Sequence, residues 1–152
     1  MMRARVFGLG QPAAGDDGFG VAVVRALRER GVPRGVEVQH LSDPSSLAAL
    51  LDANVPVVIV DAVLGSPPGE LLALTPDELA TRAPLRVSSH GLGITEAIGL
   101  VRVLDAGADL SEVRIVAVTI TRPAGYRYGL SAEVAAAVPR AADRVLQLLG
   151  VA

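Results

Sequence analysis

The feature that most constrains the fold is a run of eight residues, 56–63, that is apolar except for one aspartate, Asp61. A strand of this kind is typical of the centre of a parallel sheet, where helices cover both faces. A second β-branched run, residues 113–119, has nearly the same character. Because parallel neighbours need crossover connections, which are usually helices, the chain is expected to alternate strands with helices.

The rest of the sequence fits this alternation. β-branched runs at residues 5–9 and Val36–Leu41 predict two more strands, and residues 70–74 predict a short antiparallel strand at an edge. Helical spacing predicts helices over residues 16–30, 93–106 and 131–149, and Ser42 or Asp43 caps a short helix that runs from Pro44 to Ala53. The predicted core faces of the three long helices are Gly20, Val23, Val24 and Leu27; Ile94, Ala97, Ile98, Val101 and Leu104; and Val134, Val138, Ala142, Val145 and Leu149.

These elements predict a single domain over residues 1–152 with a three-layer α/β/α sandwich. Its twisted sheet is expected to have about five strands, mostly parallel, with the antiparallel strand at one edge. In such sheets ligands bind outside the carboxyl ends of the strands, where the strand order reverses. Polar residues near the ends of the predicted strands are therefore the candidates for a site.

The composition argues against several classes of partner and of catalytic or metal-binding group. All 14 basic residues are arginine and the formal net charge is −2, which argues against a nucleic-acid partner. The absence of cysteine excludes thiol nucleophiles, disulfides and thiolate metal ligands from this chain. The sequence shows neither a signal peptide nor a membrane-spanning run of roughly 20 apolar residues. We expect a soluble cytoplasmic protein with no membrane partner.

A glycine-rich loop follows the first predicted strand and begins Gly8-Leu-Gly10. It matches the dinucleotide-binding fingerprint weakly, because Ala13 takes the place of the third glycine and Pro12 interrupts the loop. The spacing of a phosphate loop is also present, but two aspartates stand where lysine and serine or threonine belong. Carboxylates there repel phosphate, so a nucleotide-binding module is kept only as an alternative.

Each acid near these strand ends has a structural and a functional interpretation. Capping of the helix that follows explains an acid at this position, and we assign that role to Asp16. The flanking glycines would let Asp17 point into a cleft instead. Asp61 ends the apolar run at residues 57–61 and is either a turn residue bonded to nearby backbone or a ligand at the carboxyl edge.

His90 lies among small residues, Ser88, Ser89 and Gly91, that leave an imidazole accessible. With Asp17 and Asp61 it makes a set of two carboxylates and one imidazole, which suits a borderline divalent ion with vacant coordination positions. These three residues are the candidate metal ligands and the candidate catalytic residues, with the catalytic group itself unassigned.

Other hydrolytic signatures are missing from the sequence. There is no His-Glu-x-x-His helix and no Gly-x-Ser-x-Gly elbow, and a triad built on Ser88 or Ser89 would need an unusual backbone next to His90. The other histidine, His40, is either a further site residue or the polar end of an ordinary strand, and we favour the strand end.

Four segments in order resemble the hydrogenase maturation protease family, over residues 3–149. They are residues 8–20, Asp61 with Pro68-Gly69, Ser89-His90-Gly91, and residues 129–134 with the helix after them. The resemblance implies an endopeptidase that removes a C-terminal extension from the large-subunit precursor of a nickel–iron hydrogenase after nickel insertion. By position it also implies that Asp17, Asp61 and His90 recognise nickel carried by that substrate, with no organic cofactor.

Some loops depart from the family pattern. Gln11 stands in place of an asparagine, His40-Leu-Ser-Asp43 in place of Asp-Gly-Gly-Thr, and residues 119–123 are atypical. Residues 39–47 resemble the branch that serves soluble NAD-linked hydrogenases, and we expect these loops to recognise the partner. A non-catalytic chaperone that docks on the nickel site without cutting is kept as an alternative. The small size and the one-to-one task predict a monomer.

Overall fold

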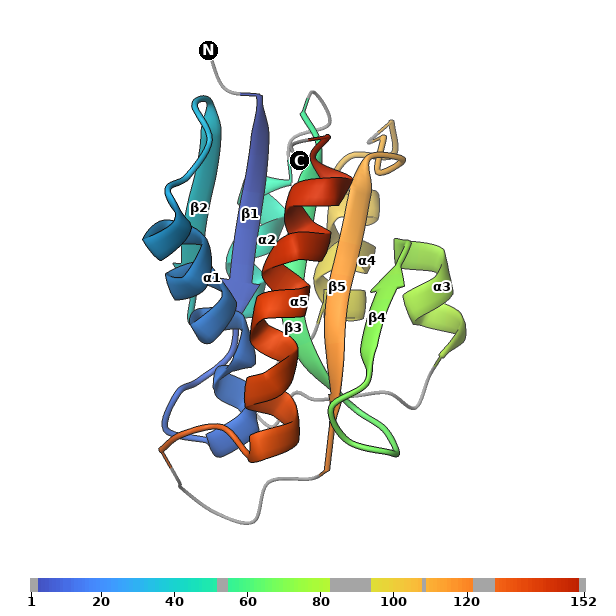
Figure 1. Ribbon diagram of the computed structural model, residues 1–152. Coiled ribbons are helices and arrows are strands. Elements are labelled where there is room, and N and C mark those ends of the chain that lie inside the picture. The colour runs from blue at the N-terminus through green and yellow to red at the C-terminus, as the bar shows by residue number, and fades with distance from the viewer. Residues whose placement is uncertain (1–2, 52–54, 83–93, 108, 122–127, 151–152) are drawn as a thin grey trace.

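A five-stranded sheet forms the centre of the computed structural model, which describes residues 3–51, 55–82, 94–107, 109–121 and 128–150. The strand order is β2-β1-β3-β5-β4, and β3 lies in the middle (Figure 1). The pairs β1–β2, β1–β3 and β3–β5 are parallel, and β4 is antiparallel to β5 at the edge. The predicted sheet is confirmed. The strands are β1 Ala4–Leu9, β2 Val36–Leu41, β3 Val57–Leu64, β4 Leu71–Leu74 and β5 Val113–Ile120.

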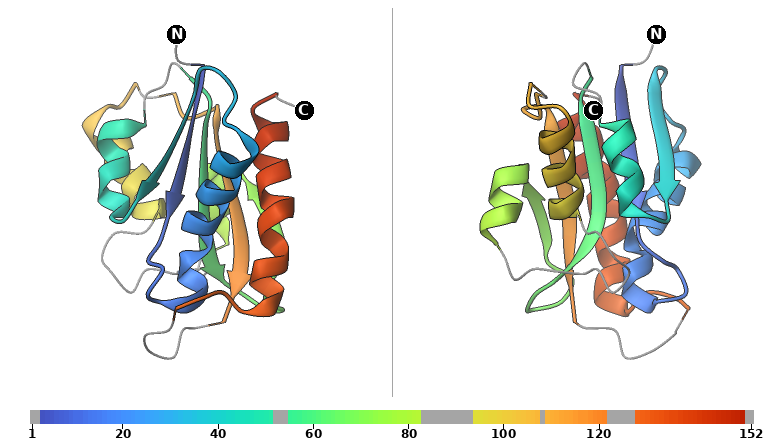
Figure 2. Two further views of the ribbon diagram at one scale, coloured as in Figure 1. Left: turned by 60° about the vertical axis from the view of Figure 1, so that its left-hand side comes forward. Right: turned by 180° about the vertical axis from the view of Figure 1, so that it is seen from behind.

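Helices cover both faces of the sheet, as Figure 2 shows. Helices α1 (Phe19–Arg30) and α5 (Ala132–Leu148) pack together on one face. Helices α2 (Leu47–Leu50) and α4 (Ile94–Leu104) pack together on the other, with the short α3 (Pro76–Thr81) beside β4. This arrangement confirms the predicted α/β/α layers.

The apolar run that opened the sequence argument is β3, and it is buried on both faces. Its alternate residues Val57, Ile59 and Val63 belong to the core under α2 and α4. Val58, Val60 and Ala62 belong to the core under α1 and α5. Since successive side chains of a strand point to opposite faces, a strand covered on both sides is apolar along nearly its whole length, and Asp61 is the exception in β3.

The helices differ from the sequence prediction in several places. Helix α3 was not predicted, although Thr75 and Glu78 form a capping box: the Glu78 N–H donates to Thr75 Oγ1 at 3.1 Å and the Thr75 N–H to Glu78 Oε1 at 2.9 Å. A helix this short shows no apolar periodicity. Leu104, predicted for the core, is 70% exposed because α4 ends there. The predicted first helix begins as a separate 3-10 turn, Gly15–Gly18.

The predicted cap of the short helix after β2 is present, because Asp43 accepts a hydrogen bond from the Ser45 N–H at 3.0 Å ahead of Pro44. The first turn, Pro44–Ser46, is a 3-10 helix, and α2 follows it. It ends at Leu50, and residues 52–54 lie outside the described part of the chain. In the part that is described, no helix is long and apolar enough to cross a membrane.

Candidate functional site

The strand order reverses between β1 and β3. The chain leaves β1 for β2 on one side and returns to β3 on the other, so the two connections diverge at the carboxyl ends of β1 and β3. Ligands of open α/β sheets bind in the crevice that such a reversal creates. The glycine loop after β1 and Asp61 of β3 both belong to this part of the edge.

Asp61 lies inside β3 and not at its end, which corrects the sequence prediction. It pairs with Ala117 of β5, and β3 continues to Leu64. The register between β1 and β3 ends at Gly8 and Val60, so Asp61 is the first residue of β3 beyond it. The structure thus places a carboxylate in a buried strand just beyond the point where its pairing with β1 ends.

The electrostatics of Asp61 follow from this position. Burial raises the pKa of its carboxyl to about 8, opposed by the hydrogen bond from the Ala62 N–H and reinforced by the negative charge of Asp17. That N–H donates to Asp61 Oδ1 at 2.8 Å. Near neutral pH the side chain therefore holds a proton, and a nearby cation would favour its ionised form.

Glycines bring the start of α1 down onto the strand ends. A Cβ on Gly20 would overlap the carbonyl oxygen of Leu9 and would lie 2.8 Å from that of Val60. Gly10 has a φ of +120°, and a Cβ there would overlap the carbonyl oxygen of Asp17. Only glycine permits backbone segments to approach this closely. The two contacts hold the 3-10 turn, and with it Asp17, over the end of the sheet.

Asp17 is half-buried in that turn, and its Oδ2 accepts the Gln11 N–H at 3.0 Å. A carboxylate therefore occupies the backbone N–H that a phosphate-binding loop would offer to its ligand. This hydrogen bond is evidence against the nucleotide-binding alternative.

The prediction that Asp16 caps the helix after it is wrong. No side chain caps the 3-10 turn or α1. The Asp16 carboxylate instead accepts two hydrogen bonds from Ser131, the N-cap residue of α5. Sequence alone could not locate this partner, because it lies 115 residues further along the chain.

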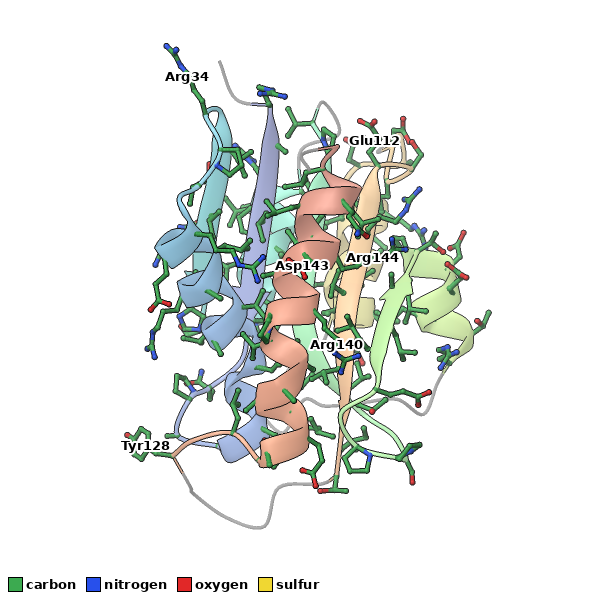
Figure 3. All side chains as sticks on the ribbon, viewed as in Figure 1. Arg34, Glu112, Tyr128, Arg140, Asp143 and Arg144 are labelled. Carbon is green, nitrogen blue, oxygen red and sulfur yellow. The ribbon has the colours of Figure 1, made fainter. Side chains whose placement is uncertain are left out.

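The loop after β3 is anchored at the same edge by Thr119, which the sequence analysis did not single out as a site residue. The buried Thr119 hydroxyl donates to the Pro67 carbonyl at 2.6 Å and accepts the Glu70 N–H at 2.9 Å. Gly69 packs against Glu133 at the start of α5, where an added Cβ would come within 2.8 Å of the Glu133 Cβ. Tyr128 is 82% exposed and projects from this edge (Figure 3).

Two of the three candidate ligands, Asp17 and Asp61, lie in the described part of the chain, and the charge of Asp17 contributes to the raised pKa of Asp61. His90 lies outside the described residues, as do Ser88 and Ser89. Within the described ranges, no group of three or more His, Cys, Asp or Glu side chains could hold a metal ion. His40 lies near the end of β2, and its Nε2 is hydrogen-bonded to the Gly10 carbonyl at 3.0 Å.

Comparison with known proteins decides the family. A family model described as hydrogenase maturation protease matches residues 21–148. The chain belongs to the hydrogenase maturation protease family. This family consists of peptide-bond hydrolases that process hydrogenase large-subunit precursors. The match begins after Asp17, so the family model gives no support for a role of that residue, and its position in the structure is what supports one.

Individual proteins match nearly the whole chain. Protein FrxA of Pyrococcus furiosus is 34% identical over 140 residues, which cover 89% of this chain and 96% of FrxA. The hydrogenase maturating endopeptidase HybD of E. coli has a similar structure, with a TM-score of 0.78, 25% identity, and coverage of 98% of this chain and 93% of that one. The [NiFe] hydrogenase maturation protease HybD of Thermococcus kodakarensis gives 0.73 and 27%, with 97% and 99% covered.

Proposed function

We propose that this endopeptidase removes the C-terminal extension of a nickel–iron hydrogenase large-subunit precursor after nickel insertion, and that Asp17, Asp61 and His90 recognise the nickel. The observation that carries the proposal is the buried carboxyl of Asp61 at the reversal point of the sheet, whose pKa is raised by burial and further by the charge of Asp17. Family membership supplies the reaction class and the precursor as substrate.

The two carboxylates fit a divalent cation on chemical grounds. Two negative charges close together beside a buried strand are unfavourable, and part of the rise in the pKa of Asp61 comes from Asp17. A cation between them would remove that repulsion and displace the proton from Asp61. Carboxylates with an imidazole are ligands that suit nickel, and His90 would supply the imidazole.

The division of roles follows from exposure. Asp17 is half-buried in the turn above the strand ends, where a nickel ion held in the precursor could reach it. Asp61 is buried below it and would bind from the floor of the site. An ion held there can polarise a peptide carbonyl or lower the pKa of a bound water, and which group takes the proton of the attacking water is left unassigned.

The decisive experiment is mass spectrometry of a nickel-loaded large-subunit precursor before and after mixing with the protein. The proposal expects a loss of mass equal to the C-terminal extension, and no loss from the metal-free precursor. Asp17→Ala, Asp61→Ala and His90→Ala should each abolish this change, whereas the exposed acid variant Asp77→Ala should cleave like wild type.

An unchanged mass for a folded, nickel-loaded precursor would overturn the proposal. Binding of that precursor without cleavage would instead support the chaperone alternative. The cytoplasmic location, the monomeric state and the single domain over residues 1–152 stay predictions from the sequence.

A further inference from the structure

The peptide group between Gly10 and Gln11 is hydrogen-bonded at both ends. Its carbonyl oxygen lies 3.0 Å from His40 Nε2, and its N–H donates to Asp17 Oδ2 at 3.0 Å. A peptide group is planar and rigid, so a contact that fixes the carbonyl also fixes the direction of the N–H. One peptide plane therefore connects the His40 ring at the end of β2 to the Asp17 carboxylate.

The donors and acceptors along this connection are determined by the chemistry of the peptide group. A carbonyl oxygen can only accept, so His40 must carry its proton on Nε2 to make the bond. A donor on the carbonyl polarises the peptide and makes its N–H a stronger donor to the carboxylate. His40 thus both orients and strengthens the hydrogen bond that Asp17 receives.

The surrounding loop supports the same geometry. β2 and β1 pair in register with His40 opposite Gly8, which brings the ring beside the loop. The Gln11 side chain also reaches this end of β2, where its Nε2 donates to the Ser42 carbonyl at 2.9 Å. Two contacts from the end of β2 therefore hold the peptide that faces Asp17.

We propose that His40 is a positioning residue that fixes the Asp17 carboxylate for nickel recognition through the Gly10–Gln11 peptide. The inference depends on the proposed role of Asp17 and goes beyond it, because it assigns a function to a residue that does not touch that carboxylate. It also gives the segment that departs from the family pattern, residues 40–43, a mechanical role in the site.

The matched variants are His40→Leu, which removes the donor, and His40→Gln, whose side-chain amide can donate to the same carbonyl. Partners that orient metal ligands typically contribute about 10–100-fold to affinity or activity. His40→Leu is therefore expected to lower kcat/KM for precursor cleavage by at least about tenfold. His40→Gln should recover most of that loss, and Gln147→Leu, at an exposed position on α5 outside the site and the partner-recognition loops, should cleave like wild type.

A spectroscopic readout separates positioning from general stability. The backbone amide proton of Gln11 should move upfield in His40→Leu and return in His40→Gln, measured by ¹⁵N–¹H correlation spectra. In the wild-type protein the neutral His40 ring should be protonated on Nε2. Protonation on Nδ1 alone would overturn the proposal even if His40→Leu does not fold.

The outcomes distinguish this inference from the proposed function. If Asp17→Ala abolishes cleavage while His40→Leu cleaves like wild type, the positioning role is wrong and the proposed function stands. If Asp17→Ala cleaves like wild type, the proposed function is wrong. In an Asp17→Ala background, adding His40→Leu should leave nickel affinity unchanged, and a further loss would show that His40 acts independently of Asp17.

Discussion

Ser131 donates two hydrogen bonds to the Asp16 carboxylate, from its backbone N–H to Oδ1 at 2.6 Å and from its hydroxyl to Oδ2 at 2.9 Å. The contact joins the turn after β1 to the N-cap residue of α5, and it holds the start of α5 against the carboxyl edge of the sheet (Figure 1). The adjacent Asp17 faces the loop and couples to Asp61. Of the two adjacent acids, Asp16 therefore has a structural contact, and Asp17 is the one we propose for the site.

Asp16→Ala should lower the free energy of unfolding by about 1–3 kcal/mol, because it leaves the N–H of Ser131 without its charged acceptor. Urea denaturation followed by circular dichroism measures the change. Asp16→Asn keeps one acceptor oxygen and should lose less. Equal stability of Asp16→Ala and wild type would show that the contact contributes nothing.

Asp17→Ala should do the reverse. We expect precursor cleavage to be abolished while the free energy of unfolding changes by less than about 1 kcal/mol, because water can replace the carboxylate at the Gln11 N–H of a half-buried loop. The two readouts are the precursor mass and the urea midpoint. If Asp17→Ala loses cleavage only because the protein is unstable, the result would contradict a role for Asp17 in the site.

The stability of the metal-free protein should fall as the pH rises from about 4 to about 8. The unfolded chain releases the Asp61 proton near its ordinary pKa of 3.8, whereas the folded protein holds it up to about 8. Between these values the folded state binds more protons, so raising the pH favours unfolding, by at most about 1.4 kcal/mol per pH unit. Urea denaturation at a series of pH values measures the slope.

Asp61→Asn is the control for that slope. Its side-chain oxygen can still accept the Ala62 N–H, and it does not titrate. The variant should remove most of the decline in stability between pH 5 and 8 and should match or exceed wild type near pH 8. An unchanged slope would mean that Asp61 does not hold its proton in the folded state.

Gly20→Ala should destabilise the protein by about 1–3 kcal/mol or more, because its Cβ would press on the backbone of Leu9 and Val60 and move α1 off the sheet. Gly99→Ala is the matched control, since a Cβ there meets nothing within 4 Å inside α4. That substitution should stabilise by roughly 0.5–1 kcal/mol through helix propensity. Thermal unfolding of both variants tests the contrast.

Much of this fold could be predicted from the sequence, because the signals are local. Alternation of β-branched runs with helical periodicity predicted the order in which strands and long helices follow one another along the chain. The short strand after β3 was predicted to be antiparallel and at an edge, as β4 is. The apolar run of β3 predicted its central position. Helix α3 was missed because six residues show no periodicity, although Thr75 and Glu78 carried the capping signal.

The site could be predicted only in part. The proposed ligands followed from residue type and from the rule for sheet edges, and the structure adds that the charge of Asp17 raises the pKa of Asp61. The partner of Asp16 and the contact of His40 with Gly10 could not be predicted, because each joins segments that only the folded chain brings together.

The sequence by itself determined the layered α/β architecture, since strand and helix periodicities are read over a few neighbouring residues. It also determined that any metal chemistry must use carboxylates and imidazole, because the chain has no cysteine. The tertiary structure alone showed that Asp16 holds the N-cap of α5 and does not cap the helix after it. Hydrogen bonds and burial depend on distances in space. The end of β1 comes beside Asp61 only when the sheet is assembled, and Ser131 comes beside Asp16 only when α5 packs onto it.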